Sequence, residues 1–461
     1  MRITAVALID GEHYPAVVVD ALRQVGERFD FKAALFLGGT EKISSTDLQG
    51  EAGAIYGLPV VFDADMAHGL ARAIETYRPD AVVDLSDEPV LGYEQRFRLI
   101  SESLARNVGY FGSDFHFSPA SSHRVCQSPS LSVIGTGKRV GKTAVSGYVA
   151  RVLQEVVTGH SGRPAVVVIA MGRGGPAVPE VVDGAGAGIT IADLVALSRQ
   201  GRHAASDYLE DALLSKVTTI GCRRCGGGMA GEPFVSNVVD GVRLANELGP
   251  GMIVLEGSGA AIPPVGSDAK VLVAGAHQPV ETVCGVLGAY RLLVSDALVL
   301  AMAEEPLASR EKIRELAAAA WRVNPGLPVV PVVFRPRPLE DVAGKRVAFF
   351  TTALAVQEPV LRRYLEERWG AKVVLFSTRL ADRAALKAEF DRPEMAGVET
   401  VLTEIKAAAI DVVAEESTAR DLPVVPVDNL PVEVPWAKEG LLRELVEHVA
   451  TMARERFESR A

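Results

Sequence analysis

The feature that most constrains the fold is a glycine-rich loop at residues 135–143, with the sequence Gly-Thr-Gly-Lys-Arg-Val-Gly-Lys-Thr. It follows the apolar run at residues 131–134 and precedes residues 144–153, which have the composition of a helix. Glycine lets a backbone wrap around a phosphate, and the start of a helix adds unpaired N–H groups and partial positive charge. The sequence therefore predicts a phosphate-binding loop (P-loop) between a strand and a helix.

The loop assigns roles to individual residues. Lys142 is expected to reach the β- and γ-phosphates of ATP, and the Thr143 hydroxyl is expected to bind Mg²⁺. Lys138 and Arg139 are further cations that would stabilise the charge of phosphoryl transfer. The residues predicted to contact the nucleotide are Gly135, Thr136, Gly137, Val140, Gly141, Lys142, Thr143 and Ala144.

A second acid is expected near this loop. Residues 252–256 form an apolar run that ends in Glu256 and a glycine-containing turn. An acid at the carboxyl end of a neighbouring strand is placed to hold Mg²⁺, so Glu256 is predicted to be a metal ligand. The alternative is a solvated acid at a strand end. Asp183 or Asp193 is expected to supply a further ligand, and Asp193 is the preferred candidate.

Arg173 lies in a Gly-Arg-Gly-Gly turn that follows the predicted strand at residues 165–170. Open α/β sheets bind ligands at this edge, and the planar guanidinium group suits a phosphate or a carboxylate. We therefore predict a catalytic role for Arg173 in holding a substrate phosphate. The alternative is an arginine that only braces the turn.

The segment at residues 221–231 places Arg223 and Arg224 between Cys222 and Cys225, followed by several glycines. A structural zinc site needs four ligands, and no second pair of this kind exists in the sequence. The pattern favours an anion-binding nest that includes Arg223 and Arg224. A flexible loop, or metal or redox chemistry at the cysteines, is the alternative.

The order of the predicted elements indicates the α/β class. Short Val/Ile/Leu/Ala runs alternate with helix-length amphipathic segments along the whole chain, which is typical of parallel sheets covered on both faces. A chain of 461 residues is too long for one ordinary core. We predict an N-terminal α/β domain at residues 1–125 that binds substrate, a central P-loop domain with a parallel sheet at residues 126–330, and a C-terminal α/β domain at residues 331–461.

The two flanking domains contain further candidate residues. Polar clusters follow three predicted strands of the first domain, and ordinary helix capping is the alternative to a ligand site there. In the third domain, Arg335 and Arg337 are either phosphate ligands or solvent-facing charges. The candidate substrate residues in the flanking domains are Asp10, Glu12, His13, Lys42 and Lys406.

Composition limits the partners. The net charge of −10 argues against nucleic acid as a partner. No apolar run reaches the roughly 18 residues that a membrane span needs, and four cysteines in so long a chain do not make a disulfide framework. We expect a cytoplasmic protein that acts on a small phosphorylated metabolite, and a homodimer is compatible with the sequence.

Several motifs together resemble a known family. The long form of the P-loop is similar to that of dethiobiotin synthetase and related ATP-dependent synthetases. The full series of motifs resembles the cyclic 2,3-diphosphoglycerate synthetase family; it consists of the P-loop, residues 8–15 (Leu-Ile-Asp-Gly-Glu-His-Tyr-Pro), residues 36–42 (Phe-Leu-Gly-Gly-Thr-Glu-Lys), residues 171–176 (Met-Gly-Arg-Gly-Gly-Pro) and residues 403–411 (Thr-Glu-Ile-Lys-Ala-Ala-Ala-Ile-Asp).

This resemblance implies a cytosolic enzyme that uses ATP and Mg²⁺ to close 2,3-diphosphoglycerate into a cyclic pyrophosphate, with release of ADP and phosphate. Two other functions stay open at this point. One is an ATP-dependent synthetase that activates a carboxylate, and the other is a nucleotide-switch ATPase built on the same loop.

Overall fold

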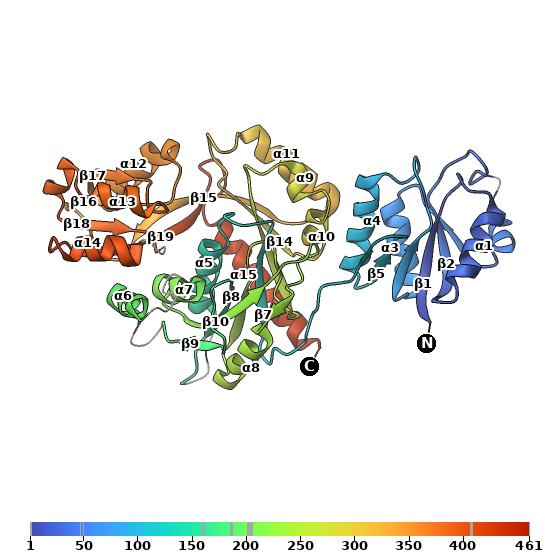
Figure 1. The fold of residues 1–461 in the computed structure, drawn as a ribbon, viewed down its shortest axis with the longest axis horizontal. Coiled ribbons are helices and arrows are strands. Elements are labelled where there is room, and N and C mark those ends of the chain that lie inside the picture. Colours follow the sequence, from blue (N-terminus) through green and yellow to red (C-terminus); the bar gives the residue numbers. More distant parts are fainter. Residues whose placement is uncertain are drawn as a thin grey trace. The chain divides into compact units, whose positions relative to one another are not determined.

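The chain forms two compact α/β units in a computed structural model that describes residues 2–46, 48, 50–157, 159, 162–184, 188–200, 206–405 and 409–460 (Figure 1). The smaller unit consists of Met1–Ser121, Pro279–Val294 and Leu316–Gly326. The larger unit consists of Ser122–Gln278, Ser295–Glu315 and Leu327–Ala461. The predicted multi-domain α/β class is confirmed. The exact domain boundaries that we drew from the sequence stay a prediction.

The smaller unit is built on a mostly parallel sheet. Its strand order is β3-β2-β1-β4-β5-β6, and only the β5–β6 pair is antiparallel. The chain runs outward from β1 to β3 and then returns to the other side of β1, so the order reverses between β1 and β4. The elements are β1 (Ile3–Ile9), α1 (Pro15–Val25), β2 (Phe29–Phe36), α2 (Ala52–Tyr56), β3 (Val60–Phe62), α3 (Met66–Tyr77), β4 (Ala81–Asp84), α4 (Tyr93–Ala105), β5 (Gly109–Phe111), β6 (His116–Phe117), α9 (Val280–Val283) and α10 (Gly288–Leu293).

The larger unit contains one long sheet, whose order in the described residues is β11-β10-β8-β12-β7-β13-β14-β15-β19-β18-β16-β17, with β9 paired to β10. Its central strands are fully buried apolar runs, as expected for parallel strands covered on both faces. The strands are β7 (Ser130–Gly135), β8 (Val166–Gly172), β9 (Glu180–Val182), β10 (Thr218–Cys225), β11 (Val235–Ser236), β12 (Met252–Glu256), β13 (Ala269–Gly275), β14 (Ala297–Ala301), β15 (Val329–Pro338), β16 (Arg346–Phe350), β17 (Lys372–Ser377), β18 (Thr400–Thr403) and β19 (Val424–Glu433).

Helices cover this sheet. They are α5 (Lys142–Val156), α6 (Ile191–Arg199), α7 (Asp207–Ser215), α8 (Val238–Leu248), α12 (Glu358–Trp369), α13 (Arg383–Glu389), α14 (Ala414–Thr418) and α15 (Leu441–Glu458), with short helical turns at Ala355–Gln357, Pro393–Gly397 and Ala409–Val413. Helix α11 (Arg310–Val323) includes residues of both units. Within the described ranges, no helix has the length and apolar character needed to cross a lipid bilayer.

Strand β15 joins the P-loop sheet to the C-terminal sheet. Its first residues pair in parallel with β14, and residues from Val332 onward pair antiparallel with β19. Strand β19 in turn begins in parallel with β18. The two sheets are therefore one hydrogen-bonded surface, and β15 and β19 fix their register.

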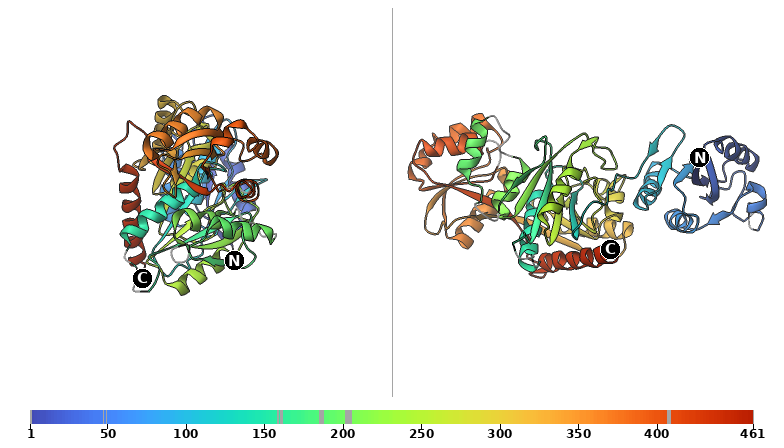
Figure 2. Two further views of the ribbon diagram at one scale, coloured as in Figure 1. Left: turned by 90° about the vertical axis from the view of Figure 1, so that its left-hand side faces the viewer. Right: turned by 90° about the horizontal axis from the view of Figure 1, so that it is seen from below.

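Helix α15 packs into the core of the P-loop sheet although it lies at the end of the chain. Leu442, Val449 and Ala453 on one face of α15 are buried in the same cluster as Val145 and Val149 of α5. Figures 1 and 2 show α15, in red, alongside α5. The sequence groups this helix with residues 331–461, but its apolar face covers β7 and β13.

We predict that Leu442→Ala will lower the free energy of unfolding of the larger unit by about 2–5 kcal/mol, because it leaves a cavity in a closely packed core. Urea denaturation would measure this loss. His448→Ala, at an exposed position of the same helix, is the matched control and should change stability by about 0.5 kcal/mol or less. Equal effects of the two substitutions would contradict the packing of α15 described above.

Candidate nucleotide and phosphate site

The P-loop connects β7 to α5, as the sequence predicts. Gly141, the residue before the helix, has a φ of 90°, a left-handed conformation that favours glycine. A Cβ atom there would also lie 2.2 Å from the ring of Phe334, so glycine is required for two independent reasons. Arg139, with a φ of 63°, holds a second left-handed position in the loop. The loop is therefore a strained turn held by its surroundings, as is common at functional sites.

Lys142 lies beneath the loop. Its Nζ donates a hydrogen bond to the Gly137 carbonyl at 2.9 Å. The absence of a side chain at Gly135 makes room for the lysine stem, because a Cβ there would lie 2.6 Å from Lys142 Cδ. Burial lowers the pKa of Lys142, while the negative charges of Glu256 and Asp207 act in the opposite direction. The lysine is thus held among acids in the larger unit.

Gln278 supports the loop from the neighbouring strand, and our sequence reasoning did not find it. Its Oε1 accepts hydrogen bonds from the Thr136 hydroxyl at 2.6 Å and from the Gly275 amide at 2.9 Å. The Thr136 amide donates to the Val273 carbonyl. Thr136 therefore fixes the start of the loop against the end of β13.

Two carboxyl groups, Glu256 and Asp207, act on the charge of Lys142, and a third, Asp211, interacts with Glu256. Glu256 ends β12, the strand paired with β7, and is 2% exposed. Asp211 is buried on α7, and Asp207 lies one helical turn before it. Burial and the charge of Asp207 raise the pKa of Glu256 to about 7. Hydrogen bonds with Asp211 and Thr143 and the charge of Lys142 lower this pKa, but by less. Burial, together with Glu256, also raises the pKa of Asp211 well above its ordinary value.

These acids fit a hard cation. Glu256 Oε2 and Asp211 Oδ2 are buried and have no hydrogen-bond partner. Unpaired buried oxygens are costly, and carboxylate and hydroxyl oxygens are the ligands that Mg²⁺ prefers. In the described ranges, no three His, Cys, Asp or Glu side chains gather in a group able to hold a metal ion. Mg²⁺ in phosphoryl-transfer sites is commonly held by one or two carboxylates together with substrate phosphates.

Two arginines converge at the same edge of the sheet. A Cβ on Gly259 would lie 3.1 Å from Arg173 Nη2 and 3.3 Å from Arg224 Nη2, so both guanidinium groups meet the turn after β12. Arg224 donates to the Ser258 carbonyl at 2.8 Å, and its Nε is buried without a partner. Neither arginine forms an ion pair with a carboxylate among the described residues. Burial and the charge of Arg173 lower the pKa of Arg224.

Arg223, the neighbour of Arg224 on β10, has a different role. Its Nε donates to the carbonyls of Gly175 and Pro176 at 3.2 Å and 2.8 Å, and so it braces the turn that contains Arg173. Side chains alternate along a strand, which explains why consecutive arginines face different surroundings. Only Arg224 is brought next to Arg173.

The two cysteines of this segment also differ. Cys222 is buried, and a Cβ on Gly241 of α8 would lie 2.3 Å from its sulfur. Burial raises the pKa of Cys222 to about 12. Cys225 is exposed, and both cysteines are free. Cys222 is therefore a packing residue between β10 and α8.

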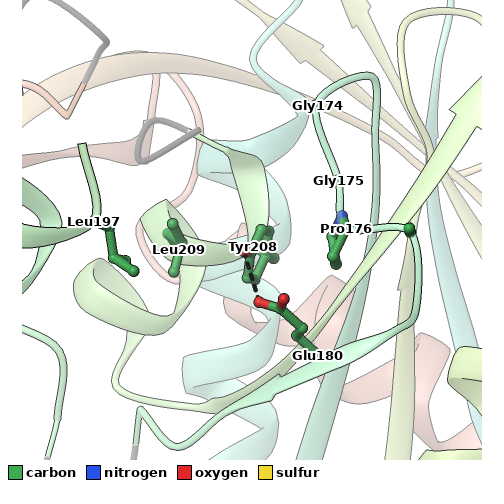
Figure 3. Close-up of a pocket in the computed structure, with 8 residues that line it drawn as sticks. Gly174, Gly175, Pro176, Glu180, Leu197, Tyr208 and Leu209 are labelled. Carbon is green, nitrogen blue, oxygen red and sulfur yellow. Dashed lines mark hydrogen bonds between the residues drawn. The ribbon is translucent and has the colours of Figure 1, made fainter. Parts of the chain in front are cut away.

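A cavity of about 240 Å³ lies beside the turn that follows Arg173. It is lined by Gly174, Gly175, Pro176, Ala177, Glu180, Leu197, Tyr208 and Leu209. Figure 3 shows the Tyr208 hydroxyl facing the Glu180 carboxylate, with a distance of 3.3 Å between the oxygens. The carboxylate of Glu180 makes this cavity unsuited to a phosphate.

The remaining candidates of the larger unit are more scattered. Asp193 accepts hydrogen bonds from the Thr190 amide and hydroxyl at the start of α6, so its carboxylate is used locally. Lys138 and Arg139 are exposed in the P-loop. Asp183 follows β9. Lys406 lies outside the described residues.

The two arginines predicted near the start of the third domain are both paired with carboxylates. Arg335 pairs with Glu304 and Arg337 pairs with Asp428, so neither is a free surface charge.

In the smaller unit, the structure brings together the loops after β1, β2 and β4. The buried Asp10 accepts hydrogen bonds from the Glu12 amide, from His13 Nδ1 at 2.8 Å, and from the Asp87 amide at 2.7 Å. Glu12 Oε1 accepts from the Thr40 amide at 3.3 Å. These contacts lie where the strand order reverses, which is where open α/β sheets bind ligands.

Lys42 and Asp84 lie at the same edge of the sheet. Lys42 pairs with Glu41, and its Nζ lies 5.4 Å from the centre of the Tyr14 ring. Asp84 accepts hydrogen bonds from Arg96 Nε and from the Tyr110 hydroxyl. Arg96 was not among the sequence candidates, because it lies within helix α4 and outside any loop motif.

A loop that places Lys142 and Thr143 beside an acid from the neighbouring strand defines a P-loop phosphate-binding protein. Family models of cyclic 2,3-diphosphoglycerate synthetase match the chain in three segments: the N-terminal domain at residues 4–118, the P-loop domain at residues 130–333 and the C-terminal domain at residues 338–430.

Curated relatives give the same result. The cyclic 2,3-diphosphoglycerate synthetase of Rubrobacter xylanophilus is 53% identical over 92% of this chain and 93% of the relative. The relative of the same name from Thermococcus gammatolerans is 46% identical over 95% of this chain and 96% of its own length. The one from Methanothermus fervidus is 41% identical over 98% of both chains. The chain therefore belongs to the cyclic 2,3-diphosphoglycerate synthetase family, and the resemblance seen in the sequence is confirmed.

A solved structure of the hydrogenase maturation factor HypB from Archaeoglobus fulgidus aligns at 15% identity over 45% of this chain and 81% of that chain. Its TM-score of 0.27 is too low to bear on the fold.

The raised pKa of Glu256 predicts a pH-dependent stability. Between its ordinary pKa of 4.5 and about 7, the folded protein holds a proton that the unfolded chain has lost, so stability falls as pH rises through this window. Glu256→Gln should remove the part of this fall that comes from Glu256, while the buried Asp211 still contributes its own part. The stability of the variant relative to the original protein should therefore grow from pH 5 to pH 7.5, by on the order of 1–3 kcal/mol.

Urea denaturation without nucleotide or Mg²⁺ would measure this difference. Glu247→Gln, at an exposed position on α8, is the control and should leave the pH profile unchanged. Parallel pH profiles for the original protein and Glu256→Gln would contradict the burial of an ionisable carboxyl at this site.

Proposed function

We propose that the chain is an ATP- and Mg²⁺-dependent synthetase that closes 2,3-diphosphoglycerate into cyclic 2,3-diphosphoglycerate, with release of ADP and phosphate. The observation that carries this proposal is the convergence of Lys142, Arg173 and Arg224 at the carboxyl ends of β7, β8 and β10. The charges of both arginines lower the pKa of Lys142, and both guanidinium groups meet the turn at Gly259, which supports a shared site.

The arrangement of cations suits a substrate with two phosphates. Lys142 belongs to the P-loop, which would take the phosphates of ATP. Arg173 and Arg224 meet at a separate turn and are not paired with a carboxylate in the described part of the chain. A guanidinium group binds phosphate oxygens in a two-point geometry, so this pair would hold one phosphate of the substrate near the P-loop.

Mg²⁺ would be held by the Thr143 hydroxyl and by Glu256, whose unpaired Oε2 is buried beneath the loop. When bound, it would neutralise part of the phosphate charge. Asp207 and Asp211 would keep the environment of Glu256 negative. Lys138 and Arg139, at the exposed part of the loop, are further cations for the transferring group.

The chemistry needs no protein nucleophile. An oxygen of one substrate phosphate attacks the γ-phosphorus of ATP, and the bond to ADP breaks. An oxygen of the second substrate phosphate then attacks the phosphorus of the first, which forms the cyclic anhydride and releases inorganic phosphate. Both steps concentrate negative charge, so catalysis consists of positioning and of stabilisation by Lys142, Arg173 and Arg224.

The wider predictions are carried forward with this proposal. The substrate is a small phosphorylated metabolite, the protein acts in the cytoplasm without nucleic acid or membrane partners, and a homodimer is the oligomeric state to test. The candidate residues of the smaller unit are Asp10, Glu12, His13 and Lys42, and they are proposed to contribute to substrate binding. A metal-ligand role for Asp193 and a substrate role for Arg223 and Lys406 stay predictions.

We predict that 2,3-diphosphoglycerate will stimulate ADP release far more than 2- or 3-phosphoglycerate, because only the diphosphate carries the internal nucleophile. Phosphorus NMR should show a pair of coupled resonances from a cyclic pyrophosphate. Lys142→Ala is the control and should form product at least about a hundredfold more slowly. ATP hydrolysis with no new phosphorus species would favour a nucleotide-switch ATPase, and product with a carboxylic acid would favour a carboxylate-activating synthetase.

Arg173→Lys should raise the KM for 2,3-diphosphoglycerate by about tenfold or more and change the KM for ATP much less, because lysine keeps the charge but loses the two-point geometry. Steady-state kinetics with each substrate varied in turn would measure this. Arg243→Lys is the control, since Arg243 is exposed on α8 and pairs with Asp240. An effect at Arg243 as large as that at Arg173 would overturn the assignment.

A further inference from the structure

A buried carboxylate in the C-terminal part of the sheet is shared by two arginines. Asp428 lies in the middle of β19 and is 3% exposed. Arg337, its register partner on β15, donates to Asp428 Oδ2 through Nε at 3.2 Å and Nη2 at 3.0 Å. Arg151 Nη2 of α5 lies 3.0 Å from the same oxygen. One carboxylate therefore links two strands of the sheet to the P-loop helix.

The same cluster reaches α7. Arg337 Nη2 also donates to the carbonyl of Leu214, near the end of α7, at 3.3 Å. Helices α5 and α7 pack closely there, because a Cβ on Gly147 of α5 would lie 2.6 Å from Ser215 Oγ. Figure 1 shows α5 and α7 next to β15 and β19. Asp428 therefore contacts the later part of α5 directly through Arg151, and it contacts the end of α7 indirectly through Arg337.

These two helices carry the groups of the candidate site. Helix α5 begins with Lys142 and Thr143, and α7 carries Asp207 and Asp211. Arg151 lies nine residues after Lys142, which corresponds to about 14 Å along a helix. Because a helix is stiff over this distance, a constraint on Arg151 also constrains the start of α5. A constraint at Leu214 acts in the same way on Asp211, one turn earlier on α7.

The contact between Arg151 and Asp428 depends on charge more than on hydrogen-bond geometry. Both terminal nitrogens of Arg151 are buried without a well-formed hydrogen bond, although one lies 3.0 Å from Asp428. Burial lowers the pKa of Arg151, and the charges of Asp428 and Asp211 oppose this. Neutralising Asp428 would leave two partly buried arginines without their shared counter-ion, which is costly.

The C-terminal sheet fixes Asp428 from the other side. The adjacent residue, Asn429, donates to Glu404 Oε1 at 3.2 Å, and the Thr351 hydroxyl donates to the same oxygen at 2.6 Å. Ile405, next to Glu404, is buried in one cluster with Leu209 and Leu213 of α7. Helix α7 therefore packs against β19 and against Ile405, which follows β18, and the hydrogen bonds of Glu404 tie this segment to β16 and β19.

We propose that Asp428 and Arg337 are positioning residues of the nucleotide site, through which the C-terminal sheet holds α5 and α7 in the arrangement that brings Thr143, Glu256 and Asp211 together. The inference rests on the proposed use of Mg²⁺ and a nucleotide at the P-loop. It gives the C-terminal sheet a role in the reaction although none of its described residues needs to touch substrate.

The test compares Asp428→Asn, Arg337→Met and the milder Arg337→Lys with Arg335→Met. Arg335 lies two residues earlier on β15, is itself buried, and binds the partly buried Glu304 through two hydrogen bonds. Its loss should lower the melting temperature without disturbing α5 or α7. The first readout is ADP affinity by calorimetry as a function of Mg²⁺ concentration, and the second is kcat for cyclic product.

We expect Asp428→Asn and Arg337→Met to raise the Mg²⁺ concentration for half-maximal ADP binding by about two- to thirtyfold and to lower kcat, with a smaller change for Arg337→Lys. Arg335→Met should leave the Mg²⁺ requirement unchanged. If a variant fails to fold, Arg337→Lys carries the comparison alone, because it keeps the buried charge. An unchanged Mg²⁺ requirement in folded Arg337→Lys and Asp428→Asn, or an equal rise in Arg335→Met, would overturn the proposal.

These outcomes are separate from a failure of the proposed function. If the original protein bound no ADP with Mg²⁺, or formed no cyclic product by phosphorus NMR, the proposed function would fail. If it did both and the variants matched it, only the positioning role would fail.

Discussion

The site depends on the electrostatic balance between Lys142 and the buried acids beneath the P-loop. Lys142 and Glu256 both lie where water is excluded, and burial shifts each pKa toward the neutral form. Each group reduces the cost of burying the other, because Glu256 raises the pKa of Lys142 and Lys142 lowers the pKa of Glu256.

Further charged side chains act on Lys142 and Glu256. Arg173 and Arg224 lower the pKa of Lys142, whereas Asp207 raises the pKa of both Lys142 and Glu256. Under the proposed function, the cations would hold phosphates and the acids would hold Mg²⁺. Buried groups with strongly shifted pKa values often mark functional sites for this reason.

The C-terminal sheet contributes through rigidity. Strands β15 and β19 continue the P-loop sheet, and Asp428 joins them to both helices of the site. A conventional P-loop needs only its strand and helix to be recognised, but the positions of the acids on α7 depend on this more distant support. Helix α15 adds to the same effect, because it buries the outer face of α5.

Part of this arrangement could be predicted from the sequence. The P-loop was recognisable because its glycines, lysine and threonine lie within nine residues and their conformations are set locally. Glu256 and Arg173 could be found because each directly follows an apolar strand. The family resemblance rested on the same kind of short, contiguous motif, and the relatives confirm it.

Other residues could not be found in this way. Asp207 and Asp211 lie on a helix with no motif, and Gln278 follows a strand far from the loop that it supports. Arg223 and Arg224 are adjacent, and only the register of β10 decides which of them meets Arg173.

The sequence by itself determined the α/β class, the phosphate-binding loop and the family, because these depend on local backbone conformation and on short motifs. Only the tertiary structure decided which acids face Lys142, which arginine joins Arg173, and that Asp428 holds α5 and α7. Each of these depends on contacts between residues that are distant in the chain. Strand order and register create such contacts, and no local pattern of residues specifies them.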